Sequence, residues 1–136
     1  MPIDSTLIGK SSEPQTFLLS REAVERFMEA TEDPDLHSGK PIEYAPPTFP
    51  TTFRIAIPGL ELDNTKMQVL HGEQAYDYTR PLRIDEEVTC VARITDIRER
   101  QGRTGAMTLI VRELVGTDSN REHIFTARST SIVRMR

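Results

Sequence analysis

The spacing of hydrophobic and polar residues changes character once along this chain, near residue 66. In the first half, a short stretch places apolar side chains at helical spacing, at Ala23, Val24, Phe27 and Met28. Ser20 precedes this stretch as a suitable N-cap, and Glu22 falls in the first turn, where a negative charge is favourable. The pattern predicts an amphipathic helix over about residues 21 to 30, stopped by Pro34.

From residue 66 onward, apolar and polar positions alternate with the period of β-strands. Turn signals such as QGRTG and GTDSN separate the alternating stretches, which are residues 66–80, 86–100, 106–115 and 121–135. Parallel strands need a crossover of roughly a dozen residues or more, whereas these connections are short, so the strands must pair largely antiparallel. The chain is therefore predicted to be an α+β protein.

A mostly apolar segment, YAPPTFPTTFRIAIPG, joins the two halves. Proline is tolerated in a first helical turn, so a second helix is expected to start near Pro47 or Pro50 and to end before Pro58. This helix has little polar face, and an antiparallel sheet buries one face. The simplest arrangement is a curved sheet wrapped around a central helix. Residues 1–16 show little periodicity and form an N-terminal arm before a single domain, 17–136.

Composition narrows the class of protein. A chain of 136 residues fits one domain, and with 37% apolar and 28% charged residues it has an ordinary globular composition. No apolar run approaches the roughly 20 residues of a membrane-spanning helix, and the start of the chain lacks a signal-peptide pattern, so a cytoplasmic location is expected. Cys90 is the only cysteine, which excludes an internal disulfide and a cysteine-based zinc site. Strand alternation makes it a small buried hydrophobe.

The net charge of −4 argues against a sequence-independent nucleic-acid binder, because such binding depends on clustered Lys and Arg. Basic residues do concentrate late in the chain, in RERQGR and RSTSIVRMR. They could meet an anionic ligand such as the phosphates of a coenzyme, or they could simply lie in solvated loops and strand edges.

Three stretches carry a resemblance to a known family: YAPPTFPTTF, LHGEQAYDYTRPLRIDEEV and TDIRERQGRTGAM. They resemble the MaoC-like dehydratase and R-specific enoyl-CoA hydratase group, especially the N-terminal dehydratase domain related to type I fatty acid synthases. The resemblance covers roughly residues 17 to 134. It implies a hot-dog fold, acyl-CoA or acyl-ACP as substrate, and a homodimer or a heterodimer with a second MaoC-like chain. It implies no metal or redox cofactor, and neither a nucleic-acid nor a membrane partner is expected from the charge and hydropathy of the chain.

In active members of that group, the loop after the first helix carries an Asp and, five residues later, a His. Here Glu32 lies five residues before His37, and Asp33 lies four before it. Water addition to an enoyl thioester needs one group to activate the water and another to move the proton at the alpha carbon. The resemblance therefore makes Glu32 and His37 the candidate catalytic pair, with Asp33 as the alternative acid. The other interpretation is an acidic helix end running into a turn, with His37 exposed.

The thioester oxygen needs hydrogen-bond donors as it gains negative charge, and backbone N–H groups at a helix start can provide them. Prolines lack this donor, so in APPTFP the available amides are those of Thr48 and Phe49. In the alternative interpretation of this motif, the prolines only fix the start of a helix that packs in the core.

His71, in LHGEQ, is the remaining candidate for substrate binding. The alternative is a hydrogen-bonded structural histidine beside Gly72. Tyr76 and Tyr78 are expected to lie on the strand face shared with Leu70 and Gly72, where they pack or, in the alternative interpretation, line an acyl channel.

Three functions remain open from the sequence. The first is a 3-hydroxyacyl thioester dehydratase or enoyl-CoA hydratase, a hydro-lyase. The second is a noncatalytic acyl-binding subunit that pairs with a catalytic chain. The third is a thioester-binding or thioesterase-like module without hydratase chemistry.

Overall fold

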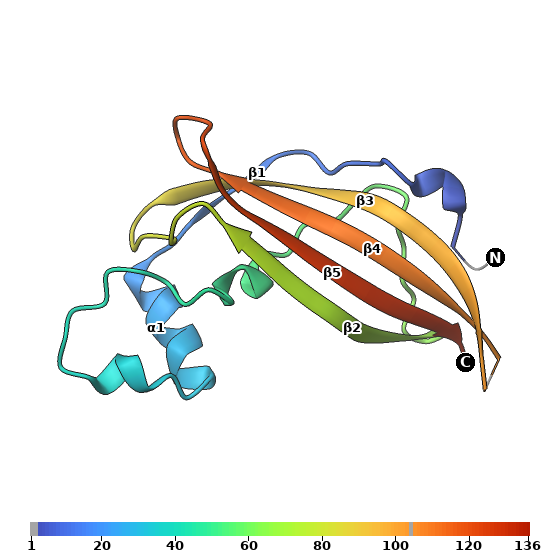
Figure 1. The fold of residues 1–136 in the computed structure, drawn as a ribbon, viewed down its shortest axis with the longest axis horizontal. Helices are drawn as coiled ribbons and strands as arrows, with labels where there is room; N and C mark the ends of the chain where they lie inside the picture. Colours follow the sequence, from blue (N-terminus) through green and yellow to red (C-terminus); the bar gives the residue numbers. More distant parts are fainter. Residues whose placement is uncertain (1–2, 104) are drawn as a thin grey trace.

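The computed structural model describes residues 3–103 and 105–136. Its main element is a five-stranded sheet with the strand order β1-β3-β4-β5-β2, in which every neighbouring pair is antiparallel. The strands are β1 (Gln15–Leu18), β2 (Met67–Tyr78), β3 (Glu87–Gly102), β4 (Gly105–Thr117) and β5 (His123–Met135). The long strands curl into a half barrel, and the one α-helix of the described residues lies at one end of it (Figure 1).

This helix, α1 (Arg21–Ala30), has the predicted bounds. The Ser20 hydroxyl accepts a hydrogen bond of 3.1 Å from the N–H of Ala23, which confirms the predicted N-cap. Val24 and Met28 are buried on the helix face that packs into the core. The predicted amphipathic helix is therefore confirmed.

The four predicted strands are confirmed, and the short strand β1 is an addition that the sequence did not indicate. It pairs with the start of β3, where Phe17 lies opposite Val88. The chain before β1 continues along the same edge, because the N–H of Ser12 donates to the carbonyl of Ala92 at 2.8 Å. With only four residues, β1 is too short to show a period-two pattern.

The helix predicted between Pro47 and Pro58 is wrong in its extent. Only a single 3-10 helix, η3 (Phe49–Thr52), forms there, and the chain beyond it is extended. The hydroxyls of Thr51 and Thr52 each donate to the carbonyl three residues earlier, at 2.9 Å. Threonine, isoleucine and phenylalanine are weak helix formers, and the residue before a proline avoids helical geometry. The concave face of the sheet is consequently crossed by an extended segment, residues 53–57.

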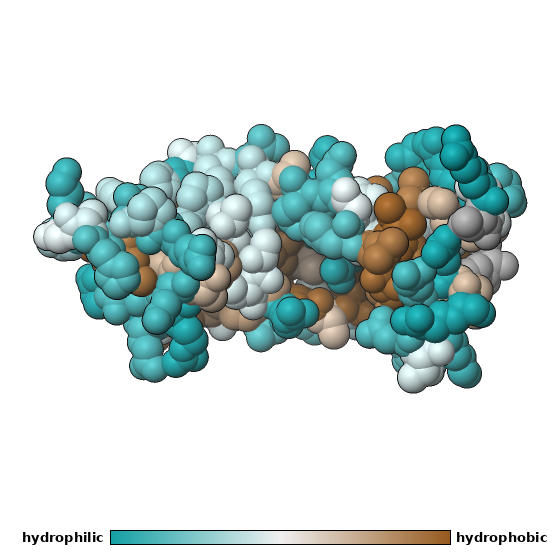
Figure 2. All heavy atoms as spheres, turned by 90° about the horizontal axis from the view of Figure 1, so that it is seen from below, coloured by the Kyte–Doolittle hydropathy of each residue, from teal (hydrophilic) through white to brown (hydrophobic). Residues whose placement is uncertain are grey.

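The core divides into two clusters of buried side chains along the sheet. One gathers under α1 and includes Leu19, Val24, Met28, Phe49, Phe53, Leu82, Val88, Cys90 and Phe125. The other lies toward the opposite end and includes Ile3, Ile57, Ala92, Ile94, Ile97, Ile110 and Val133. The complete burial of Cys90 confirms its expected packing role. Seen from its open side, the half barrel shows apolar surface in a hollow between hydrophilic rims (Figure 2).

Candidate functional site

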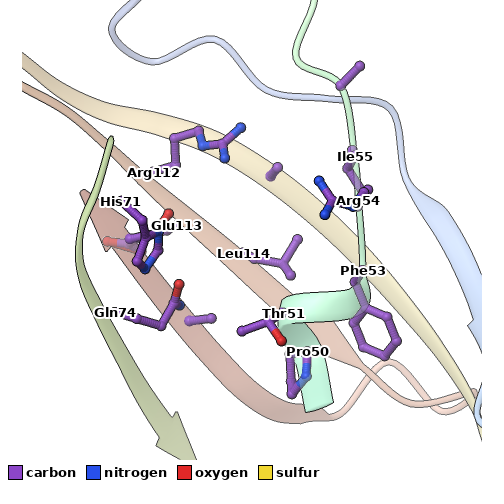
Figure 3. A pocket seen from close by; sticks show the side chains of 14 residues that line it. Pro50, Thr51, Phe53, Arg54, Ile55, His71, Gln74, Arg112, Glu113 and Leu114 are labelled. Atoms are coloured by element: carbon purple, nitrogen blue, oxygen red, sulfur yellow. The ribbon is translucent and has the colours of Figure 1, made fainter. Parts of the chain in front are cut away.

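A cavity of about 740 Å³ lies between the concave face of the sheet and the extended segment, where the two core clusters meet. Figure 3 shows side chains of both walls around this space. Arg54 comes from the extended segment, His71 and Gln74 from β2, and Arg112 and Leu114 from β4. The cavity therefore combines apolar walls with several polar and cationic groups.

Strand register explains why the sheet leaves room here. Gln74 pairs with Ser129, Ser129 with Arg112, and Arg112 with Ile94, so one row across four strands is partly polar. Residues directly opposite in an antiparallel ladder share a face of the sheet. In the neighbouring row, Ala127 lies between the larger side chains of Tyr76 and Leu114. The small side chains of Ala127 and Ser129 on β5 thus leave space that larger side chains would fill in a fully packed core.

A β-bulge in β2 aims two polar residues at this space. The register with β5 shifts between His71 and Glu73, at Gly72. A bulge adds one residue to the strand and moves all later side chains to the opposite face. His71 before the bulge and Gln74 after it consequently both line the cavity.

The same bulge corrects the expected position of two tyrosines. Tyr76 and Tyr78 do pack against the cluster under α1, as predicted. They do not share a face with Leu70, which lies on the other side of the bulge and is 47% exposed. Burial raises the pKa of Tyr78, whose hydroxyl donates a hydrogen bond of 2.6 Å to the carbonyl of Pro47. The Tyr76 hydroxyl is buried and has no hydrogen-bond partner among the described residues.

His71 is exposed and makes no hydrogen bond within the described part of the chain. The interpretation as a hydrogen-bonded structural histidine is therefore wrong. Its position in the cavity wall leaves its proposed contact with substrate as a prediction.

Arg112 is the cationic residue that sequence reasoning missed. It lies on the cavity face of β4 between Ile110 and Leu114 and is half-buried, and this burial lowers the pKa of its guanidinium. Among the described residues it has neither an ion pair nor a hydrogen bond. Strand β4 carries apolar residues on both faces, for example Leu109 and Ile110, so alternation alone did not tell which face points inward.

The acidic loop after α1 is built from local backbone contacts. The N–H of Asp33 donates to the carbonyl of Met28 at 2.8 Å, and the N–H of Glu32 donates to that of Glu29 at 3.1 Å. This pair of bonds is a Schellman motif, in which one residue adopts left-handed geometry. Glu32 is that residue, with φ of 56°. Glu32 is thus the residue at which the chain leaves the helical conformation and α1 ends.

The other two loop candidates are also placed by a short helix, the 3-10 helix η2 (Pro34–His37). The Asp33 carboxylate caps it by accepting the N–H of Asp35 at 3.0 Å. His37 is its last residue, is exposed, and makes no hydrogen bond to Glu32 or Asp33. None of the three residues lines the large cavity, although Asp33 borders a smaller one of about 500 Å³.

The two predicted oxyanion donors differ in availability. The N–H of Phe49 already donates to the carbonyl of Pro46 at 2.9 Å. The N–H of Thr48, the residue that precedes η3 as its N-cap, makes no hydrogen bond within the described ranges. Of the two amides, that of Thr48 is therefore the better placed to serve a ligand.

Within the described ranges, no three His, Cys, Asp or Glu side chains gather as metal ligands do. The helices of the same ranges are all too short or too polar to cross a bilayer.

Comparison with solved structures identifies the class of fold. The crystal structure of the C-terminally truncated HadBC (3R-hydroxyacyl-ACP dehydratase) complex from Mycobacterium tuberculosis superimposes with a TM-score of 0.70 at 19% identity, over 93% of this chain and 96% of that chain. A solved MaoC-like dehydratase gives a TM-score of 0.73 at 22% identity, over 93% of this chain and 42% of that longer chain. The curled antiparallel sheet with one α-helix is accordingly a hot-dog fold.

The family follows from sequence comparison. The model of the FAS1-like dehydratase domain region matches residues 6–127, and the chain belongs to this family. A UPF0336 protein from Thermobifida fusca is 32% identical, over 98% of this chain and 95% of that protein. The resemblance to MaoC-like dehydratases and to the dehydratase region of type I fatty acid synthases is thus confirmed.

Proposed function

We propose that this chain is the acyl-thioester-binding subunit of a two-chain hot-dog hydratase or dehydratase, and that a partner chain supplies the catalytic acid and base. The state of the acidic loop carries this proposal. Glu32 ends α1, Asp33 caps η2, and His37 faces solvent without an acidic partner. Water addition to an enoyl thioester requires a positioned base and a proton donor at hydrogen-bonding distance of the reacting atoms. It requires no metal or redox cofactor.

The ligand proposed for the large cavity is the acyl part of acyl-CoA or acyl-ACP. Its volume of about 740 Å³ falls within the usual range of small-molecule sites. The thioester would lie near the start of η3, where the amide of Thr48 can donate to its oxygen. His71 would contact the bound acyl group from β2.

The free edge of β2 supports pairing with another chain. β2 is the last strand of the sheet and is 12 residues long, so one row of its backbone groups has no partner strand among the described residues. Long exposed edges invite pairing with another strand. The similar HadBC structure is a complex, and the similar MaoC-like chain is more than twice as long as the part matched by this chain. A second hot-dog unit beside β2 is consistent with both.

A second candidate is that the chain is itself a hydratase. One observation favours it: Asp33 borders the smaller cavity, together with Tyr44 and Pro47, close to Thr48. In this case Asp33 or Glu32 would act with His37 after the loop rearranges on substrate binding.

Two measurements on the purified chain separate these candidates. The acyl-binding proposal predicts that the chain binds butyryl-CoA, a saturated thioester that cannot be hydrated, in a calorimetric titration. It also predicts no hydration of crotonyl-CoA above the buffer rate by the chain alone. Hydration by the chain alone that disappears in His37→Ala, but persists in the control His123→Ala, would instead establish the second candidate. His123 borders neither cavity.

A further inference from the structure

The polar row across the concave face contains a charge that the described residues do not balance. The row runs from Gln74 through Ser129 to Arg112 and ends at Ile94. Arg112 is half-buried and without an ion pair or hydrogen bond among the described residues. Withdrawing a charged group from water is unfavourable unless it is paired, so this position calls for an anion.

The acidic groups near Arg112 already have partners of their own. Glu113 borders the cavity, but its carboxylate lies 3.4 Å from the guanidinium of Arg128. Asp96, on the neighbouring strand β3, pairs with Arg98 at 2.7 Å. The remaining charged or titratable side chains of the cavity wall are Arg54, which adds a second positive charge, and His71, which adds a ring nitrogen able to donate a hydrogen bond. The balancing anion is therefore expected to come with a ligand.

We propose that the cavity binds an acyl group that carries a carboxylate remote from its thioester, and that Arg112 binds this carboxylate. The inference rests on the proposed function, whose ligand class it makes specific. A planar guanidinium matches the two oxygens of a carboxylate with parallel hydrogen bonds. Ser129 lies directly opposite Arg112 and provides a further donor, and Gln74 provides another one strand further along the same row.

The position of Arg112 favours a carboxylate over a coenzyme phosphate. Its neighbours along β4 are Ile110 and Leu114, and the cavity wall around it includes Ile55 and Ala127. These apolar groups suit the methylenes of an acyl chain, whereas coenzyme phosphates are strongly hydrated. An unsubstituted acyl chain, in turn, offers nothing to a half-buried cation.

The test compares two thioesters of equal chain length, adipoyl-CoA and hexanoyl-CoA, by calorimetric titration of the full chain. The wild type is expected to bind adipoyl-CoA roughly tenfold or more tightly than hexanoyl-CoA, since one hydrogen-bonded charge distinguishes them. Arg112→Met is expected to abolish this preference and to leave hexanoyl-CoA binding within about twofold. Arg93→Met, on the exposed face of β3, is the matched control and is expected to keep the preference.

Three other results would each overturn the inference. Equal binding of the two thioesters to the wild type overturns the inference and leaves the proposed function intact. Equal weakening of adipoyl-CoA, hexanoyl-CoA and free CoA in Arg112→Met assigns the arginine to coenzyme phosphates and also overturns it. Failure of every thioester to bind overturns the proposed function, and the inference with it. If Arg112→Met does not fold, Arg112→Gln serves the same comparison. The relative affinity of the wild type for the two thioesters is measured without any variant.

Discussion

The hydroxyl of Tyr78 donates a hydrogen bond of 2.6 Å to the carbonyl oxygen of Pro47, 31 residues earlier in the chain. This bond joins the end of β2 to the turn that precedes η3. It therefore fixes the extended segment over the concave face, where that segment forms one wall of the large cavity.

Replacing Tyr78 by phenylalanine removes this bond and retains the ring that packs against Phe125. We expect the free energy of unfolding to fall by about 1 kcal/mol, the usual net value of one hydrogen bond. Urea denaturation measures the change. Tyr44→Phe is the control and is expected to have no effect, because the Tyr44 side chain is exposed and no hydrogen bond of its hydroxyl is found in the described ranges.

Glu32→Gly is predicted to stabilise the protein slightly or to leave it unchanged. Glu32 has φ of 56°, a conformation in which a Cβ is unfavourable and glycine is not. Relief of this strain, set against the greater freedom of glycine in the unfolded chain, gives a gain of about 0 to 1 kcal/mol. Thermal unfolding provides the measurement.

Glu29→Gly is the control for that substitution, because Glu29 lies inside the last turn of α1 with helical geometry. There glycine is expected to destabilise by about 1 kcal/mol. A loss of stability in Glu32→Gly comparable to that in Glu29→Gly contradicts the role assigned to Glu32 as the left-handed residue of the Schellman motif.

Acid is predicted to destabilise the fold partly through Glu86. Burial raises the pKa of this carboxyl, but hydrogen bonds from Arg80, at 2.7 and 2.9 Å, and from the amide of Arg83 outweigh it and hold the pKa below its ordinary value. A carboxyl with a lowered folded-state pKa stabilises the fold above its unfolded pKa. This contribution is therefore expected to disappear as the pH falls below about 4.3 and through the folded-state pKa.

The corresponding variant is Glu86→Gln, expected to cost about 2 kcal/mol at neutral pH and to show a flatter decline of stability in acid. Glu25→Gln is the control, because its pair with Arg21 is exposed and spans 3.9 Å, and it is expected to cost less than about 0.5 kcal/mol. If the free energy of unfolding falls equally with decreasing pH in wild type and Glu86→Gln, Glu86 is excluded as a cause of the acid destabilisation.

The elements with strong periodicity could be predicted from the sequence, and those fixed by distant contacts could not. The bounds of α1 followed from Ser20 and the apolar stripe, and the antiparallel sheet followed from its short connections. The segment after Pro47 has the apolar content of a buried helix but consists largely of residues that form helices poorly. Its extended path depends on contacts with the sheet, such as the stacking of Phe53 on Phe17 with ring centroids 4.5 Å apart.

The candidate site was predictable only in part for the same reason. His71 was named from its motif and does line the cavity. Arg112 points inward because of the register of β4 with β5. His71 and Gln74 lie in the same cavity wall because of the bulge at Gly72. Neither register nor a bulge is encoded in local alternation. The acidic loop shows the converse, since its spacing resembles an active family member while its backbone bonds assign the acids to helix ends.

Whether a partner chain supplies the catalytic acid and base is decided by the turnover of crotonyl-CoA, measured on this chain co-purified with a MaoC-like partner chain. We expect that the pair hydrates crotonyl-CoA and that His37→Ala in this chain leaves turnover within about twofold of the wild-type pair. Loss of a general acid or base typically lowers turnover by about 10²- to 10⁴-fold. A loss of that size on His37→Ala in this chain contradicts the assignment of catalysis to the partner.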